Sequence, residues 1–406
     1  MLPFCYAIMS YELLIAEKPD AAKKIAEALA DGKVIKQTDN GVPYYVLTHN
    51  RKDIVVGCAV GHLYSVAEKV KGKWTYPVFD IEWKESSETN KGASYTKKYV
   101  SVLKKLVKDA NEFTVCTDLD IEGETIGLNV VKYICKQKDA NRMKFSTLTK
   151  PDLVKSYETK AKTLDWGLAN AGETRHFLDW MYGINYSRAL SIAIKNAGQF
   201  KIISIGRVQG PALKILVDKE EEIKKFIPVP YWQIELHGKA KNSDIIANHK
   251  TDKFWEKDEA QKIYDTCKGK KAVVKDITKT RFKQDPPVPF DLTSLQMESY
   301  KTLGISPKNT LECAQTLYTE GYISYPRTSS QQLPKELNLK NILQELAKNQ
   351  AYAALAKTVL SGKLIPKQGE KTDPAHPAIH PTGIPPKRLE DREAKIYDLI
   401  VHRFFA

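Results

Sequence analysis

The stretch that decides the fold class is LLIAEKP at residues 13–19. Its four apolar residues predict a buried strand, and a proline such as Pro19 is typical of the first turn of a helix. The apolar side of that helix would consist of Ala22, Ile25, Ala26 and Leu29. A buried strand followed directly by an amphipathic helix predicts an α/β layer.

The rest of the chain extends this pattern. Residues 113–117 predict a second strand, and the apolar residues that follow, up to Ile134, recur at helical spacing. Residues 150–225 are mostly helical in periodicity. Proline-rich breaks at 226–231 and 285–289 cannot lie inside helices, and we expect the second break to link domains. Helices are predicted again at 294–304 and 309–321, and an exposed loop at 361–374.

An acidic cluster follows the second predicted strand. Asp118, Asp120 and Glu122 are spaced two residues apart, so in an extended segment they would line one face. Three converging carboxylates need a compensating cation, and oxygen ligands are those that Mg²⁺ prefers. The alternative is an acidic cap on a helix that begins near Gly123. Glu17 favours the metal site, because it ends the first predicted strand and would reach the same edge of a sheet if the two strands are neighbours.

A tyrosine segment, Ile323-Ser-Tyr-Pro-Arg327, follows the last of these helices. A phenol is a weak nucleophile near neutral pH, and we expect the guanidinium of Arg327 to lower the free energy of its anion. Tyr325 is therefore a candidate nucleophile, although a structural tyrosine on an extended segment remains the alternative. A nucleophile, a carboxylate set and a cation together indicate phosphoryl transfer.

Charge and composition narrow the function classes. Lys and Arg number 63 against 49 Asp and Glu, which gives a net charge of +14 in 406 residues and favours a polyanionic partner. The six cysteines form no Cys-x-x-Cys pair, which fits a reducing, cytoplasmic setting. Residues 1–9 are too short and uncharged for a signal peptide, and no apolar run reaches the roughly 20 residues that span a bilayer.

Seven stretches, taken in order, resemble the type IA DNA topoisomerases, closest to the archaeal and topoisomerase III-like branch. They are LIAEKP (14–19), AVGHL (59–63), DLDIEGE (118–124), DWMYGINYSR (179–188), SIGRVQGP (204–211), EGYISYPRT (320–328) and AHPAIHPT (375–382). The ordered set covers almost the whole chain, and it is far more specific than any one stretch.

The resemblance implies a multidomain α/β plus α fold, with an N-terminal Toprim domain and ring-forming helical and β domains. It implies a Toprim domain at 1–150, a helical single-strand-binding domain at 151–225, a first β-rich arch segment at 226–285, the tyrosine domain at 286–380 and a return segment at 381–406. By the same resemblance, Tyr325 attacks single-stranded DNA, forms a 5′-phosphotyrosine link and releases a 3′-hydroxyl. Another strand passes before religation, without ATP, so that negative supercoils are relaxed or DNA is decatenated.

Roles for further residues come from the same resemblance. Arg327 would contact the phosphate oxygens, and His376 would orient the phosphate or the carboxylates. Lys18 would either protonate the leaving 3′-oxygen, with the assistance of Glu17, or hold the scissile phosphate. The implied Mg²⁺ ligands are Glu17, Asp118, Asp120 and Glu122, and the implied DNA-binding residues are Arg175, Asp179, Tyr182, Asn185, Arg188, Arg207 and Gln209. Single-stranded and negatively supercoiled DNA are the expected partners of a monomer in the cytoplasm, associated with the nucleoid; a helicase partner stays open.

The chain departs from the family pattern in three places. Ile121 stands where many members have an arginine, and Ser329 and His380 also differ from many members. The sequence stops at Ala406, where the family's ring would continue, so we expect a part of a longer protein. Two other functions stay open: a fragment that binds or cleaves DNA without strand passage, and a Toprim nuclease or primase-like enzyme, which would not need Tyr325.

Overall fold

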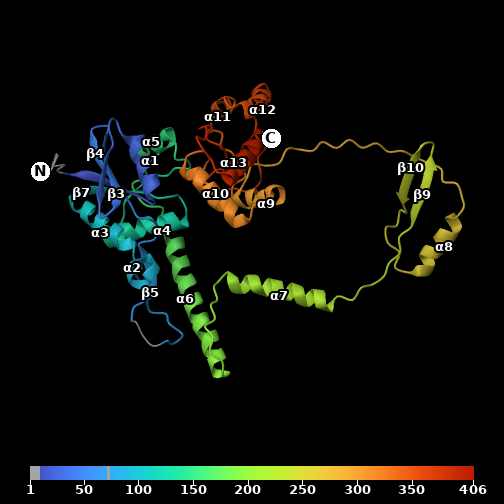
Figure 1. Ribbon diagram of the computed structural model, residues 1–406, viewed down its shortest axis with the longest axis horizontal. Helices are drawn as coiled ribbons and strands as arrows, with labels where there is room; N and C mark the ends of the chain where they lie inside the picture. The colour runs from blue at the N-terminus through green and yellow to red at the C-terminus, as the bar shows by residue number, and fades with distance from the viewer. Residues whose placement is uncertain (1–9, 71–73) are drawn as a thin grey trace. The chain divides into compact units, whose positions relative to one another are not determined.

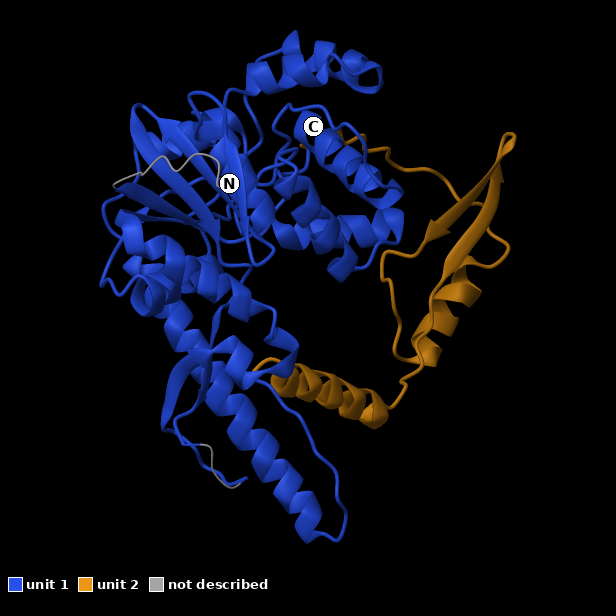
Figure 2. Ribbon diagram, turned by 60° about the vertical axis from the view of Figure 1, so that its left-hand side comes forward, with its two compact units in different colours: residues 1–206, 286–406 blue, residues 207–285 orange. Residues whose placement is uncertain are grey.

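The computed structural model describes residues 10–70 and 74–406 and divides into two compact units (Figures 1 and 2). One unit contains residues 1–206 and 286–406, and the other contains residues 207–285. The prediction that residues 1–9 are not a signal peptide falls on residues that the structure does not describe. Among the described residues, no helix combines the length and the apolar character needed to cross a bilayer.

The N-terminal part of the first unit is built on a six-stranded sheet with the order β2-β3-β4-β1-β7-β8. Its strands are β1 (Tyr11–Ala16), β2 (Ile35–Asp39), β3 (Val42–His49), β4 (Lys52–Cys58), β7 (Ala110–Cys116) and β8 (Asn141–Arg142). β1 is completely buried and runs parallel to both β4 and β7. The predicted strands at 13–16 and 113–117 are therefore neighbours, which the predicted metal site requires.

Helices cover both faces of this sheet (Figure 1). α1 (Pro19–Leu29) begins with Pro19 as predicted, and its side with Ala22, Ile25, Ala26 and Leu29 is buried against the sheet. α5 (Lys150–Glu158) packs beside α1. The other face is covered by α3 (Thr96–Leu106) and by α4 (Ile121–Asn129), which continues into the π-helical turn η3 (Val130–Ile134).

Smaller elements complete this part. A hairpin of β5 (Tyr64–Glu68) and β6 (Ile81–Glu85) is followed by α2 (Ser86–Thr89), and two 3-10 turns flank α3, η1 (Lys91–Ala93) and η2 (Val107–Asp109). The long helix α6 (Trp166–Asn196) packs across α4 at Gly172. A Cβ added to Gly172 would lie 1.9 Å from Oγ1 of Thr125 and 2.8 Å from the carbonyl oxygen of Ile121, so only glycine permits this crossing.

The C-terminal part of the first unit is helical. Its helices are α9 (Leu292–Leu303), α10 (Pro307–Thr319), α11 (Leu339–Leu346), α12 (Gln350–Leu360) and α13 (Asp391–Phe405). α10 packs against α9 and α13 around buried residues such as Leu317 and Ile400. The helices predicted at 294–304 and 309–321 correspond to α9 and α10, and the predicted loop at 361–374 contains no helix or strand.

The second unit, taken by itself, contains α7 (Gln209–Lys225), an antiparallel hairpin of β9 (Glu235–Ala240) and β10 (Ser243–Asn248), and α8 (Lys257–Cys267). α7 ends at Lys225, directly before the predicted break at 226–231. The unit ends at Asp285, the first residue of the predicted linker.

Candidate active site

Tyr325 lies in an extended segment that the first unit holds from both sides. Its backbone N–H donates to the carbonyl of Ser146 at 2.9 Å, which ties the segment to the N-terminal α/β part. The preceding residue, Ser324, donates from its backbone N–H to the carbonyl of His380. The phenol of Tyr325 is 2% exposed and donates to Oδ2 of Asp120 at 2.5 Å. The tyrosine and the acidic cluster, separated by about half of the chain, are thus in direct contact.

Burial and the neighbouring charges together set the pKa of Tyr325. Burial, followed by the charges of Asp120 and Asp118, raises the pKa of Tyr325 well above the usual value for a phenol. Arg327 lowers this pKa by less than the other groups raise it. The predicted direction of the Arg327 effect is therefore confirmed, but burial and the two aspartates outweigh it. Because the phenol stays neutral, Asp120 is the group placed to accept its proton.

The acidic cluster is arranged around the start of α4 rather than along an extended strand. Asp118 lies in the loop after β7, Asp120 is the N-cap of α4, and Glu122 lies in its first turn. Oδ1 of Asp120 accepts the backbone N–H of Gly123 at 2.7 Å. The expectation that all three acids line one extended face is therefore wrong, because the backbone donors at the helix start draw Asp120 into a cap and turn Glu122 away.

Asp118 and Glu17 meet where β7 and β1 end. Burial, together with the charge of Glu17, raises the pKa of the Asp118 carboxyl, whereas Lys18 lowers it. Nζ of Lys18 lies 3.2 Å from Oε1 of Glu17. The hydroxyl of Tyr318, on α10, donates to Oδ1 of Asp118 at 3.0 Å. Carboxylates that repel one another in a partly buried place are suited to a hard divalent cation such as Mg²⁺.

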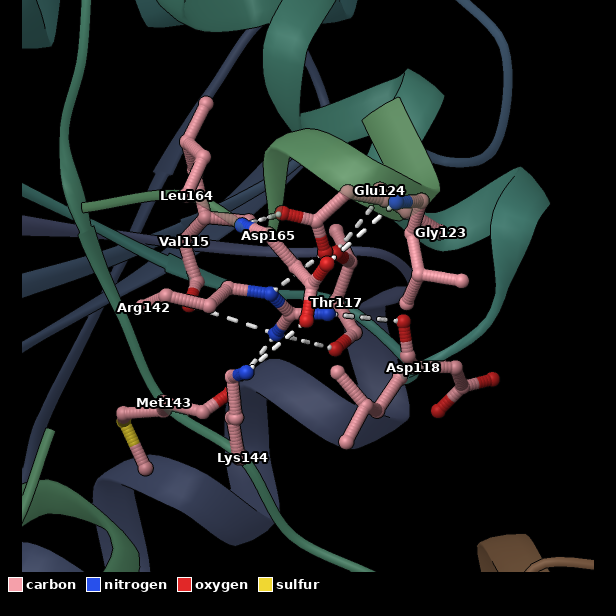
Figure 3. Close-up of polar contacts among 12 residues, drawn as sticks. Val115, Thr117, Asp118, Gly123, Glu124, Arg142, Met143, Lys144, Leu164 and Asp165 are labelled. Atoms are coloured by element: carbon pink, nitrogen blue, oxygen red, sulfur yellow. Dashed lines mark hydrogen bonds and ion pairs between the residues drawn. The ribbon is translucent and has the colours of Figure 1, made fainter. Parts of the chain in front are cut away.

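A buried ion pair supports the loop that carries Asp118 (Figure 3). Nε of Arg142 donates to Oε2 of Glu124 at 2.7 Å, and neither side chain is exposed. The guanidinium also donates to the carbonyls of Thr117 at 2.8 Å and Asp118 at 3.0 Å. Arg142 therefore holds the backbone of the acidic loop through two carbonyls. The carboxylate of Glu124 compensates the buried positive charge of Arg142.

His376 packs against the tyrosine, with its ring centroid 4.5 Å from that of Tyr325. Its Nε2 lies 3.0 Å from the carbonyl oxygen of Leu119, and its Nδ1 lies 3.0 Å from Oγ of Ser146. Burial lowers the pKa of His376. Because a carbonyl can only accept, the neutral ring carries its proton on Nε2 and accepts the Ser146 hydroxyl at Nδ1.

A cavity of about 670 Å³ opens beside this cluster. Among the predicted site residues, those that line it are Asp120, Glu122, Arg175, Asp179, Arg327 and His376. Arg327 is exposed there, so its guanidinium is available to an anionic ligand.

Glu122 faces different partners from the other acids. Its Oε2 lies 2.8 Å from Nε2 of His62 and 3.2 Å from Nε2 of His176, and its Oε1 lies 3.3 Å from Arg175. Hydrogen bonds from His176 and His62 hold the pKa of Glu122 well below its usual range. Glu122 is therefore grouped with imidazoles, whereas Asp118 and Asp120 are grouped with Glu17 and the tyrosines.

The remaining predicted DNA-binding residues lie outside the cavity. The ring of Tyr182 packs against that of Tyr186, with their centroids 4.5 Å apart. The side chain of Asn185 bonds to the backbone of Val78, and Arg188 pairs with Glu68 and donates to the carbonyl of Thr75. Arg207 and Gln209 belong to the second unit.

Several residues of the site were not predicted from the sequence. Tyr318, Arg142, Ser146, His62 and His176 all contact predicted site residues. His62 belongs to the AVGHL stretch that carries the family resemblance, and Tyr318 lies on the helix before the tyrosine segment, so both had a signal nearby. Arg142, Ser146 and His176 had none, because their roles depend on contacts between distant elements.

Comparisons with known proteins show the family of this chain. The family model described as DNA topoisomerase matches residues 163–406, and the one described as Toprim domain matches residues 12–148. DNA topoisomerase 1 of Methanocaldococcus jannaschii is 49% identical over 97% of this chain and 51% of its own length. DNA topoisomerase 1 of Pyrococcus horikoshii is 47% identical over 97% of this chain and 58% of its own length.

A solved structure has a similar fold. Full-length topoisomerase I from Thermotoga maritima superposes with a TM-score of 0.65 at 25% identity, covering 97% of this chain and 60% of that protein. The chain spans about half the length of the curated relatives it matches. With both family models in the expected order and a related fold, the chain belongs to the type IA DNA topoisomerases, with an N-terminal Toprim domain.

Proposed function

We propose that this chain cleaves and rejoins one strand of DNA through Tyr325, as the nucleophile of an ATP-independent type IA topoisomerase. The observation that carries the proposal is the 2.5 Å hydrogen bond from the Tyr325 phenol to Asp120, beside a cavity lined by Arg327 and His376. A buried phenol in contact with a carboxylate can lose its proton as it attacks phosphorus.

The proposed reaction exchanges one phosphoester for another. The Tyr325 oxygen forms a bond to the phosphorus, the bond from phosphorus to the 3′-oxygen breaks, and Asp120 accepts the phenolic proton. Lys18, paired with Glu17 at the end of β1, would donate a proton to the leaving 3′-oxygen. Arg327 would bind the non-bridging oxygens with its planar donors. The reverse steps rejoin the strand, so the bond energy is retained without ATP.

His376 has a positioning role in this proposal. Its ring lies against Tyr325 and is fixed by Leu119 and Ser146, which belong to the Toprim domain. His376 would therefore hold the phenol over the acidic cluster.

Glu17, Asp118 and Asp120 are the residues that would hold Mg²⁺, because they are oxygen donors that gather where β1 and β7 end. Bound there, Mg²⁺ would supply positive charge next to the phosphate. The contacts of Glu122 with two imidazoles favour a different role for that residue.

Single-stranded and negatively supercoiled DNA are the proposed substrates, and the proposed setting is the cytoplasm, in association with the nucleoid. The net charge of +14 supports a polyanionic partner. Arg175 and Asp179 line the same cavity as Arg327 and would contact the bound strand.

The test is a covalent-adduct assay. Single-stranded DNA and Mg²⁺ are incubated with the protein, the mixture is denatured, and protein attached to a 5′ end is detected. Tyr325→Phe should abolish the adduct. Tyr318→Phe is the matched control, because it removes a neighbouring buried phenol that bonds to Asp118 but not to a reacting atom, and its adduct should persist.

The outcomes separate the competing functions. DNA binding without any wild-type adduct would favour a binding fragment. Cleavage without an adduct, unchanged in Tyr325→Phe, would favour a Toprim nuclease. If the adduct forms, a negatively supercoiled plasmid then shows whether this chain completes strand passage: relaxed product supports a topoisomerase, and nicked product alone supports a cleavage-only fragment.

A further inference from the structure

Two imidazoles and a carboxylate from three separate elements meet beside the acidic cluster. His62 lies in the loop after β4, Glu122 in the first turn of α4, and His176 on α6. One ligand atom from each of the three residues lies within 4.8 Å of the other two. The side chains are 26–31% exposed, so an ion from solvent can reach them.

The donor set suits a borderline transition ion better than Mg²⁺. Imidazole nitrogen is a good ligand for Zn²⁺ and Co²⁺, and Mg²⁺ prefers oxygen. Zn²⁺ binds imidazole nitrogen and carboxylate oxygen at about 2.0–2.2 Å, and three protein ligands leave a position for water. The separations of 2.8 and 3.2 Å between Oε2 of Glu122 and the two Nε2 atoms require only small movements to accept an ion.

The surrounding contacts orient these ligands. Arg175 pairs with Oε1 of Glu122, which leaves Oε2 directed at both histidines. The Ser86 hydroxyl donates to the carbonyl of His62 at 3.1 Å and fixes its loop. The ring centroid of His176 lies 4.8 Å from that of His62 and 5.3 Å from that of Trp83. Partners of this kind hold metal ligands in place in known sites.

To bind an ion through Nε2, His62 must be neutral and carry its proton on Nδ1. Among the described residues, Nδ1 of His62 is buried and has no hydrogen-bond partner. In this structure Nε2 of His62 donates to Oε2 of Glu122, so it carries the proton. Because no partner occupies Nδ1, the proton can move to Nδ1 when an ion takes the Nε2 lone pair. Gly172 contributes the close crossing of α4 and α6 that brings His176 to Glu122.

We propose that His62, Glu122 and His176 form a binding site for a divalent transition ion of the Zn²⁺ or Co²⁺ class, separate from the Mg²⁺ carboxylates Glu17, Asp118 and Asp120. An ion bound there would tie the loop after β4, α4 and α6 together. Because α6 also carries Arg175 and Asp179, the ion would stiffen one wall of the cavity.

The test measures Co²⁺ binding to the metal-free protein in the presence of excess Mg²⁺, by equilibrium dialysis and visible absorption. Wild type should bind one Co²⁺ that Mg²⁺ does not displace, with a spectrum of nitrogen and oxygen ligands. His62→Gln and His176→Gln should each weaken binding by at least about tenfold. His237→Gln is the matched control, because His237 also pairs with a glutamate, at 3.1 Å, but belongs to no such group. Its Co²⁺ affinity should equal that of wild type.

Further measurements exclude misfolding and separate this site from the Mg²⁺ and cleavage site. Circular dichroism must show that the histidine variants fold, and Glu122→Gln gives an independent loss if one of them does not. Asp118→Asn should bind Co²⁺ as wild type does, and Tyr325→Phe should too, so this test can fail or succeed independently of the cleavage proposal. The absence of Mg²⁺-resistant Co²⁺ binding, or unchanged affinity in folded His62→Gln and His176→Gln, would overturn the proposal.

Discussion

The phenol of Tyr325 donates a 2.5 Å hydrogen bond to Oδ2 of Asp120, across 205 positions of the sequence. The contact joins the C-terminal helical part to the sheet edge where β1, β4 and β7 end. Burial and then the charge of Asp120 raise the pKa of the phenol, and the contact places a carboxylate beside it. Tyr325 and the acidic cluster therefore form one site in this structure.

Asp120→Asn should separate the two functions of Asp120. Asparagine can still cap α4 through its side-chain oxygen, so the thermal unfolding midpoint should change little. The variant loses the proton acceptor of Tyr325 and one proposed Mg²⁺ ligand, and the rate of adduct formation should fall by about 10²-fold or more at any Mg²⁺ concentration. Single-turnover cleavage of a labelled oligonucleotide measures the rate. A variant that cleaves at the wild-type rate would exclude Asp120 as the acceptor.

Arg142→Lys should destabilise the acidic loop. Lysine keeps the positive charge but cannot reproduce the planar donors that reach Glu124 and the carbonyls of Thr117 and Asp118, and a buried acceptor left without its donor costs about 1–3 kcal/mol. Denaturant unfolding measures this loss, and the Mg²⁺ concentration for half-maximal cleavage should rise. Arg392→Lys, at an exposed position of α13, is the control and should leave both quantities unchanged. Equal stabilities of the two variants would contradict the role of Arg142.

Gly172→Ala should force α6 away from α4. The added Cβ would overlap Thr125 and the backbone of Ile121, and overpacking of this kind costs about 1–3 kcal/mol. The variant should also bind Co²⁺ more weakly, because His176 moves from Glu122. Gly167→Ala on the same helix meets only Asp165, at 3.4 Å, and should be neutral or slightly stabilising. Matching unfolding midpoints for the two variants would show that the crossing tolerates a methyl group.

Glu12→Gln should reveal a pH-dependent stabilisation of the sheet. Burial raises the pKa of Glu12, but hydrogen bonds from Lys160, Lys52, Thr114 and Tyr157 outweigh it, so the net pKa lies below the ordinary value of 4.5. A lowered folded-state pKa adds stability above pH 4.5, and this stability is lost as the pH falls through the folded value. The variant should lose about 3 kcal/mol at pH 7.

The difference between Glu12→Gln and wild type should therefore narrow towards pH 3, as measured by urea unfolding across the pH range. Glu27→Gln is the control, because Glu27 is exposed on α1 and its pairing with Lys23 spans 3.8 Å. Exposed pairs contribute less than about 1 kcal/mol. A constant difference at all pH values would show that the charge of Glu12 is not the stabilising feature.

The sequence predicted the elements that depend on local pattern. The buried strand ending at Ala16, the helix opening at Pro19 and the helices before the tyrosine segment were all confirmed, because apolar periodicity and end residues encode them locally. Family membership was likewise readable from ordered motifs. The acidic loop was predicted less well, because Asp120 caps α4 and Glu122, in the first turn of α4, contacts His62 and His176 instead.

By itself, the sequence determined the strand-and-helix order, the excess of positive charge and the candidate residues Tyr325, Asp118 and Asp120. Only the tertiary structure decided that Tyr325 bonds to Asp120, that Glu122 turns to His62 and His176, and that Arg142 supports the acidic loop. The physical reason is that periodicity reports which face of an element is buried, whereas a side chain's partners and its pKa depend on which distant elements pack against it.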